Sequence, residues 1–245
     1  MLSRILSVVK PVAPKIRLGS KYDGGYVIVD DIGNYDAFFS AGVSNDVNFE
    51  NDFITKIGYD IPCLAYDGTV HKLPPGSNPK IQFFSKNIAA TNSAATTNLL
   101  HEIEPFNDVF LKMDIESHEY AFFLNMPAAS RQKLKQIVVE VHQPFTYGTP
   151  YPSLDLGWTT SQKFEMLLNL AATHHLVHLH GNNYSGTTFV DGIEAPNVLE
   201  LTYVRKGDVI ITGPSTDPIP GPHDAACCPY TPEIVLNHKP FYYNS

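Results

Sequence analysis

Short apolar runs alternate with helix-like segments from residue 36 onward, and this alternation constrains the fold most strongly. The apolar runs are rich in Phe, Val and Ile, as in "DAFFSA" at residues 36–41 and "DVFLKMDIE" at residues 108–116. An amphipathic segment, "DVNFENDFITKIG" at residues 46–58, follows the first run. Buried strands that alternate with helices are typical of βαβ units and a mostly parallel sheet. The sequence therefore predicts an α/β fold, with one doubly wound sheet and helices on both faces.

The predicted sheet has seven strands. They are residues 36–41, 61–67, 80–86, 108–116, 135–142, 176–183 and 198–206. The last of them, "VLELTYVRK", alternates in polarity, which predicts an antiparallel strand at the edge of the sheet. Helices are predicted at residues 46–58, 93–103, 130–135 and 159–175, the last of them with a Thr or Ser cap.

The length of 245 residues fits one domain with a sizeable core. We expect a lead segment at residues 1–35, a Rossmann-like core at 36–206 and a proline-rich extension at 207–245. The extension shows no periodicity. No repeat and no linker divides the chain.

The composition excludes several partners and locations. The chain has 17 Lys and Arg against 25 Asp and Glu, a net charge of −8, and no basic run, which argues against nucleic acid and anionic membranes. Three cysteines without a C-x-x-C pattern favour a reducing compartment. The amino terminus lacks the apolar core of a signal peptide, and no stretch approaches roughly 18 apolar residues. We therefore expect a soluble, cytoplasmic protein.

The ends of the predicted strands supply the candidate site, because ligands in doubly wound sheets bind beyond the carboxyl ends. Gly42 follows the first strand, at a turn that suits a close approach to a ligand. Asp46 and Glu50 follow Gly42. Without a ligand, Asp46 is explained as the cap of the following helix and Glu50 as a solvated acid in its first turn. Asp67 lies 25 residues after Gly42, where Rossmann-type sites hold a ribose. A simple Asp-Gly turn explains Asp67 equally well.

Three further strand ends are rich in acids and histidines. Carboxylates that leave a buried strand are costly without partners, so we expect them to face water, a cation or a ligand. Residues two apart in a strand share a face, which pairs Glu140 with His142 and His178 with His180. The other polar residues at these ends are Asp114, Glu116, His118, Glu119, Asn182 and Asn183.

Six motifs in order resemble one family. They are "RLGSKYDGGYVI", "FFSAGVSNDVNFE", "LKMDIESHEY", "IVVEVH", "VHLHGNNY" and "PNVLELTYVRK". Between Arg17 and Lys206 the chain resembles the FkbM-type class I methyltransferases, in the methyltransferase-like branch. This resemblance implies a seven-stranded sheet and S-adenosylmethionine as the methyl donor. One departure is Ser117, where members of the family often have Gly.

The resemblance also implies which residues contact the methyl donor. Asp23 to Tyr26 would close over its methionine part, Asp67 would hold its ribose, and Asp114 would lie near the methionine ammonium or the acceptor. The full set of expected cofactor-binding residues is Lys21, Asp23, Gly24, Gly25, Tyr26, Gly42, Val43, Ser44, Asp46, Glu50, Asp67 and Asp114.

The expected reaction is O-methylation, and the expected acceptor is a hydroxyl of a sugar or glycan. This choice of acceptor follows from the resemblance alone. The acceptor must lose a proton, and His142 and His118 are the expected bases because histidine titrates near neutral pH. Asp114 completes the expected catalytic group. A divalent cation, Mg²⁺, Mn²⁺ or Ca²⁺, would fit a second set of ligands, although a hydrogen-bonded network explains them as well. That set is Asp114, Glu140, His142 and His180.

Two other functions remain open from the sequence. One is a catalytically silent module that binds a partner or a glycan, and the other is a metal-dependent hydrolase that uses the acids and histidines. In the tail, His223, Cys227 and Cys228 suggest a further metal site. Adjacent cysteines do not easily ligate one tetrahedral ion, so we expect a structural tail.

Overall fold

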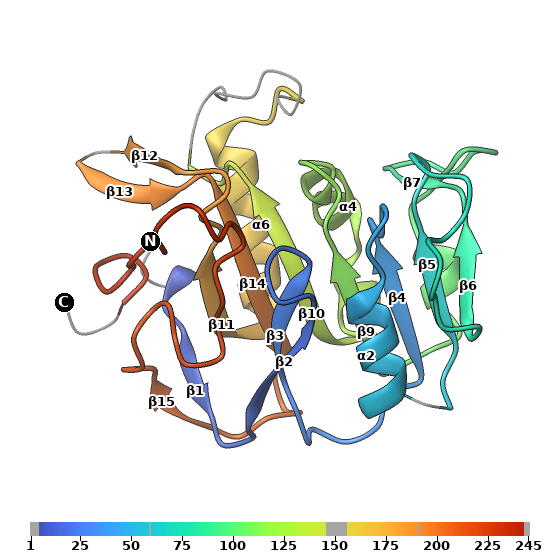
Figure 1. Cartoon of the computed structure of the whole chain (residues 1–245), viewed down its shortest axis with the longest axis horizontal. Coiled ribbons are helices and arrows are strands. Elements are labelled where there is room, and N and C mark those ends of the chain that lie inside the picture. The colour runs from blue at the N-terminus through green and yellow to red at the C-terminus, as the bar shows by residue number, and fades with distance from the viewer. Residues whose placement is uncertain (1–4, 59, 146–155, 191, 243–245) are drawn as a thin grey trace.

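A seven-stranded sheet forms the centre of the computed structural model, which describes residues 5–58, 60–145, 156–190 and 192–242 (Figure 1). The chain starts in the middle of the sheet, runs outward to one edge and then crosses to the other side, so strand order reverses between β4 and β9. The order confirms the predicted class I methyltransferase fold. Across the sheet it is β6 (Ile81–Phe84), β5 (Cys63–Tyr66), β4 (Ala37–Ala41), β9 (Val109–Met113), β10 (Leu134–His142), β14 (Val198–Arg205) and β11 (His174–Gly181).

The last strand of the sheet in sequence, β14, lies inside it. It pairs antiparallel with both β10 and β11, so its predicted direction is confirmed and its predicted edge position is wrong. Seven of its eight residues are buried. Its alternating polarity reflects two differently covered faces, because Leu201 belongs to the apolar core whereas Glu200 and Thr202 face buried polar groups.

Helices cover the apolar face of the sheet. These are α4 (Glu119–Asn125), α5 (Ala128–Arg131) and α6 (Thr160–Thr173), and side chains of α4 and α6 share one core cluster with β9, β10 and β14. Helix α6 begins at a capping box formed by Thr159 and Gln162, as its first residues predict. A second apolar cluster, which includes Phe49, Phe53 and Phe110, lies on the other face of the sheet.

Helix α2 (Asn48–Lys56) and a hairpin cover the other face, on the near side in Figure 1. The hairpin consists of β2 (Lys15–Gly19) and β3 (Gly25–Val29). The ring of Phe53 lies 4.4 Å from that of Phe110 on β9, which anchors α2 to the sheet. The hairpin lies beside α2, and β3 reaches over β10 and β14.

Several short elements complete the described chain. Two predicted helices are shorter than expected. The segment 93–103 contains a two-residue strand and then a single helical turn, and the segment 130–135 contains the end of α5 and the start of β10. None of the described helices is long and apolar enough to span a membrane. The short elements are β1 (Val9–Pro11), β7 (Asn87–Ile88), β8 (Thr96–Thr97), α3 (Leu100–Ile103), β12 (Thr187–Val190), β13 (Ile193–Pro196) and β15 (Ile211–Pro214), which pairs with β1.

Candidate functional site

Four neighbouring strands place one polar residue each on the same side of the sheet. Glu140 on β10 pairs directly with Glu200 on β14, which pairs with His180 on β11. Asp114 follows the β9 residue that pairs with Val139. Directly paired residues share a face, so these side chains form one row across four strands. We call Asp114, Glu140, Glu200 and His180 the polar row.

Partners from other elements satisfy the carboxylates at the centre of the polar row. The Tyr26 hydroxyl lies 3.0 Å from Glu140 Oε2 and 3.2 Å from Asp114 Oδ2, and Asn182 Nδ2 donates to Glu140 Oε1 at 2.9 Å. Burial, followed by the charge of Asp114, raises the pKa of Glu140 well above its usual range. One phenol proton serves only one carboxylate at a time. The pair therefore favours an additional proton or a cation.

His142 at the end of β10 is held between acids. Its Nδ1 lies 3.2 Å from Glu119 Oε1, and its Nε2 lies 3.2 Å from Glu116 Oε2 and 4.0 Å from Asp114 Oδ1. Burial lowers the pKa of His142, but the nearby carboxylates, led by Glu119, outweigh it and raise that pKa to about 10. The imidazole is therefore protonated at neutral pH. The reason for choosing His142 as a base, an ordinary pKa, does not hold in this environment.

The predicted metal set is divided between two places. Three of its members have potential ligand atoms within 4.8 Å of one another: Asp114, Glu140 and His142. The fourth, His180, instead lies 2.8 Å from Glu200 and 3.1 Å from Glu233. Burial lowers the pKa of His180, and hydrogen bonds to these two carboxylates raise it to about 10.

A cavity of about 400 Å³ opens beyond the ends of β4, β5, β6 and β9, where strand order reverses. Its volume lies within the range of small-molecule sites, about 300–1,000 Å³. Tyr66, Ile88 and Ile115 supply apolar wall. The predicted site residues that line it are Gly42, Ser44, Asp67, Asp114 and His118.

The backbone around residue 42 leaves room only for glycine. Its φ is +80°, and a Cβ on it would lie 1.7 Å from the carbonyl oxygen of Asp114. The close approach predicted at this turn is therefore to the neighbouring strand end. Lys112 Nζ donates to the Gly42 carbonyl at 2.8 Å and lies 3.4 Å from Glu50. Glu50 is fully buried, so its interpretation as a solvated acid is wrong.

Asp67 binds the loop after β4. Its Oδ2 accepts from the backbone N–H groups of Val43 at 3.2 Å and Ser44 at 2.8 Å. Its Oδ1 accepts from the N–H and the hydroxyl of Thr69. Burial raises the pKa of Asp67, but these hydrogen bonds outweigh it and the net shift is downward. The amides that would hold a phosphate in a dinucleotide site are thus already occupied by a carboxylate.

The Asp-Gly-Gly turn of the hairpin lies at the polar row. Carboxylate oxygens of Asp23, Glu140 and Glu200 are within 4.8 Å of one another. Asp46 joins the turn to α2, because it accepts from the Ser20 hydroxyl and from the N–H of Asn48. The expected cofactor residues that do not line the cavity are Lys21, Asp23, Gly24, Gly25, Tyr26, Val43, Asp46 and Glu50.

The departure from the family pattern at Ser117 has a backbone explanation. Ser117 has φ +71° and the preceding Glu116 has φ +54°, both in the left-handed region that favours glycine. A glycine, which members of the FkbM-type family often have at this position, would relieve this strain. The turn leads to His118, which directly precedes α4 and lines the cavity.

Sequence reasoning missed Glu200 and Glu233, and it set Cys227 aside as part of a structural tail. Glu200 carried a signal, because it is the one acid within the otherwise uncharged run "VLELTYV", and a buried acid needs partners. Cys227 and Glu233 lie in a segment without periodicity, and no local pattern links them to the sheet. His178 and Asn183 also hold this segment, through Asp224 and the backbone of Cys228.

Comparisons with known proteins reach this chain only distantly. No protein-family model and no curated protein matches it. One similar solved structure is a fibrillarin pre-rRNA processing protein of Methanococcus jannaschii, at 11% identity and a TM-score of 0.37, covering 74% of this chain and 70% of that one. Another is a mutant 16S rRNA (adenine(1408)-N(1))-methyltransferase of Catenulisporales acidiphilia with SAM, at 12% identity and a TM-score of 0.35, covering 78% and 98%. Such distant likenesses carry no argument about function, and membership of the FkbM branch stays a prediction.

Replacing Gly42 tests the contact between the two strand ends. Gly42→Ala should lower the free energy of unfolding by about 2–5 kcal/mol, since it combines left-handed strain with overpacking. Gly76→Ala is the matched control, because Gly76 also has a positive φ but a Cβ there would meet no other described residue within 4 Å. That control should cost about 1–2 kcal/mol. Equal losses in urea unfolding would contradict the proposed contact.

Proposed function

We propose that the chain is an S-adenosylmethionine-dependent methyltransferase that methylates a hydroxyl of a sugar or glycan. The observation that carries this proposal is the bond from Asp67 to the N–H groups of Val43 and Ser44. These two amides are therefore not available to a phosphate, while the cavity at the reversal of strand order remains. A nucleoside ligand without phosphates fits this arrangement better than a dinucleotide.

The residues of the cavity fit such a ligand. Among the described residues, Asp67 Oδ1 accepts only from Thr69, whose hydroxyl a ribose hydroxyl can replace. The Nδ1 atom of His118 is buried and has no hydrogen-bond partner in the described part of the chain. Asp114 supplies a carboxylate for an ammonium group. Bound S-adenosylmethionine would supply a methyl group on a sulfonium, which a correctly aligned nucleophile can attack.

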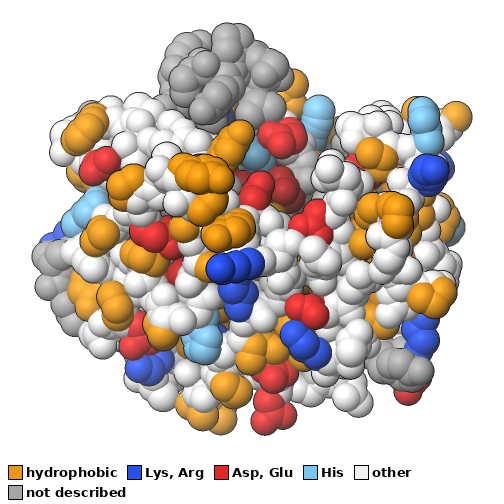
Figure 2. Space-filling view, in the orientation of Figure 1, with side chains coloured by type: hydrophobic (Ala, Val, Ile, Leu, Met, Phe, Trp, Pro, Cys, Tyr) orange, Lys and Arg blue, Asp and Glu red, His pale blue; other side chains and the backbone are white. Residues whose placement is uncertain are grey.

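The polar row supports a hydroxyl-bearing acceptor. Carboxylates and the amide of Asn182 are suited to hydrogen bonds with hydroxyls. Figure 2 shows acidic side chains gathered above the carboxyl ends of the parallel strands. Together with the net charge of −8, this argues against a nucleic-acid acceptor.

Within this proposal, His118 is the base and His142 is a ligand. The unpartnered Nδ1 of His118 can accept the proton of the acceptor hydroxyl. Binding of Mg²⁺, Mn²⁺ or Ca²⁺ would displace the Nε2 proton of His142, whose ligand atom lies within 4.8 Å of those of Asp114 and Glu140. When bound, such a cation would orient a sugar diol and lower the pKa of its hydroxyl. Glu119 fixes the His142 ring for this task.

Ligand binding and methyl transfer test the proposal. Calorimetry should detect binding of S-adenosylmethionine and S-adenosylhomocysteine, but not of ATP or NAD. Asp67→Ala should weaken binding at least about tenfold, because it removes the charge-assisted hydrogen bonds that shape the loop. Lys80→Ala, remote from the cavity lining, is the matched surface control.

Labelled methyl should then appear on a glycan acceptor. Binding without transfer to any glycan would favour a silent binding module, and hydrolysis without methyl transfer would favour a hydrolase. Either result contradicts the proposed reaction.

Removal of divalent cations tests the ligand role of His142. Exhaustive chelation should reduce transfer at least about tenfold, and Mg²⁺ or Mn²⁺ should restore it. Glu140→Gln should abolish this restoration while binding of S-adenosylhomocysteine persists. Undiminished turnover in the chelated protein would show that the three residues form only a hydrogen-bonded network.

A further inference from the structure

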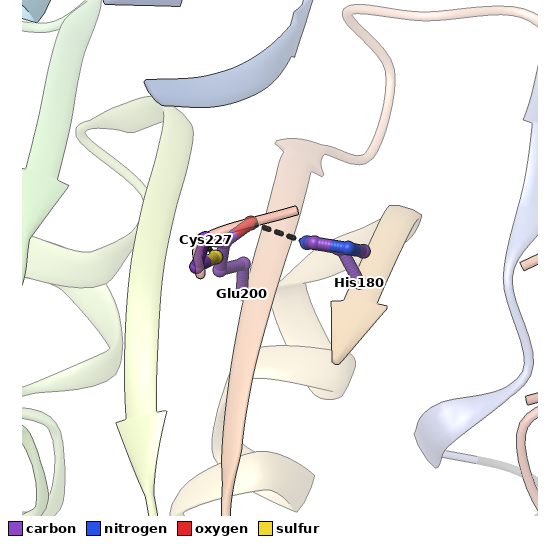
Figure 3. A group of neighbouring side chains, drawn as sticks. All are labelled: His180, Glu200 and Cys227. Atoms are coloured by element: carbon purple, nitrogen blue, oxygen red, sulfur yellow. Dashed lines mark hydrogen bonds and ion pairs between the residues drawn. The ribbon is translucent and has the colours of Figure 1, made fainter. Parts of the chain in front are cut away.

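Three buried donors of different chemistry converge at the far end of the polar row. His180 comes from β11, Glu200 from β14 and Cys227 from the C-terminal segment, which we define as residues 213–242 (Figure 3). His180 Nδ1 lies 2.8 Å from Glu200 Oε2, and Cys227 Sγ lies 3.1 Å from Glu200 Oε1. All three residues have ligand atoms within 4.8 Å of one another.

These separations suit a tetrahedral zinc ion. Zn–N and Zn–O bonds of about 2.1 Å and Zn–S bonds of about 2.3 Å place tetrahedral donors about 3.4–3.6 Å apart. The two contacts at Glu200 need to lengthen by only a fraction of an ångström to reach that spacing, and the donor atoms of His180 and Cys227 lie within 4.8 Å of each other. A thiolate with an imidazole selects zinc over the hard ions that carboxylates alone prefer.

The surroundings of His180 match those of a zinc ligand. Its second nitrogen, Nε2, lies 3.1 Å from Glu233 Oε2. Histidines that bind zinc almost always donate their other N–H group to a carboxylate, a carbonyl or water, which fixes the ring. Glu233 belongs to the same C-terminal segment as Cys227, so both sides of the imidazole are already oriented.

The backbone around Cys227 is also fixed. Asn183 Nδ2 donates to the carbonyl of Cys228 at 2.9 Å, and Asn183 Oδ1 accepts from the N–H of Cys228 at 2.9 Å. This pair of bonds holds the peptide beside Cys227. The buried thiol of Cys227 is thereby kept at Glu200, whereas Cys228 is only half-buried and lies outside the donor group.

We propose that His180, Glu200 and Cys227 bind one Zn²⁺ ion that clamps the C-terminal segment onto β11 and β14. The fourth position is left to water or to Asp23, whose carboxylate lies beside Glu200. This site is distinct from the three residues proposed above for a hard cation, and it does not depend on the methyltransferase proposal. It also gives Cys227 a ligand role without its neighbour Cys228, whereas the sequence favoured a structural tail over a metal site of His223, Cys227 and Cys228.

Metal content and cobalt spectroscopy test the zinc site on the full chain. The purified protein, reconstituted with Zn²⁺ and desalted, should retain one equivalent of zinc by mass spectrometry. Co²⁺ in its place should give a thiolate charge-transfer absorption in the near ultraviolet. Cys227→Ser should lose both signals, and Cys228→Ser, the adjacent matched control, should keep both. Glu233→Gln should weaken zinc binding about 10–100-fold through the orientation of His180.

Each outcome decides the proposal. Circular dichroism and urea unfolding establish that each variant is folded, and proteolysis within residues 213–242 should accelerate when zinc is removed from the wild-type chain. Absence of retained zinc in the folded wild-type protein would overturn the site. A cobalt–thiolate band that survives Cys227→Ser but disappears in Cys228→Ser would overturn the ligand assignment.

Discussion

The burial of several carboxylates on one face of the sheet is the constraint on which the rest of the site depends. Carboxylates are costly to bury unless hydrogen bonds or opposite charges compensate them. The hairpin supplies Tyr26, the end of β11 supplies Asn182, and the C-terminal segment meets Glu200 and His180. Segments far apart in the sequence are thus brought together by the need to satisfy the polar row.

A second buried pair organises the cavity beside the polar row. Lys112 and Glu50 lie under the turn of Gly42, and Lys112 binds the Gly42 carbonyl. The Asp67 carboxylate binds the next two residues of the same loop. The loop is therefore held from both sides by the protein itself. This arrangement explains why a single glycine suffices where a phosphate-binding loop has several.

The alternation of apolar runs and helix-like segments predicted most of the fold, because the apolar residues in the pattern are the ones that the structure buries. Helix α6 has its Thr159 cap, α2 has an apolar face, and the strands are short, mostly apolar and buried runs. The place of β14 could not be predicted from alternation, which arises equally from solvent exposure and from a buried polar face. Its internal acid, Glu200, was the better signal.

The sequence predicted which residues meet at the candidate site better than it predicted their protonation and their partners. Strand ends indicated Asp114, Glu140 and His142, which the fold brings together. The protonation of His142 depends on Glu119 from α4. The sequence of neither β10 nor α4 alone reveals a contact between them. The separation of His180 from that group follows from β14, which lies between β10 and β11 and places Glu200 beside His180, and the chain has no local signal for this strand order.

A crystal structure with S-adenosylhomocysteine tests the central claim most directly, because anomalous scattering locates the ligand sulfur. The account predicts the adenosine in the cavity beside Gly42 and Asp67, with the sulfur turned toward Asp114 and the polar row. Binding instead in the separate cavity lined by Lys15 and His178 would contradict it. So would a nucleotide phosphate bound by the amides of Val43 and Ser44, with Asp67 displaced.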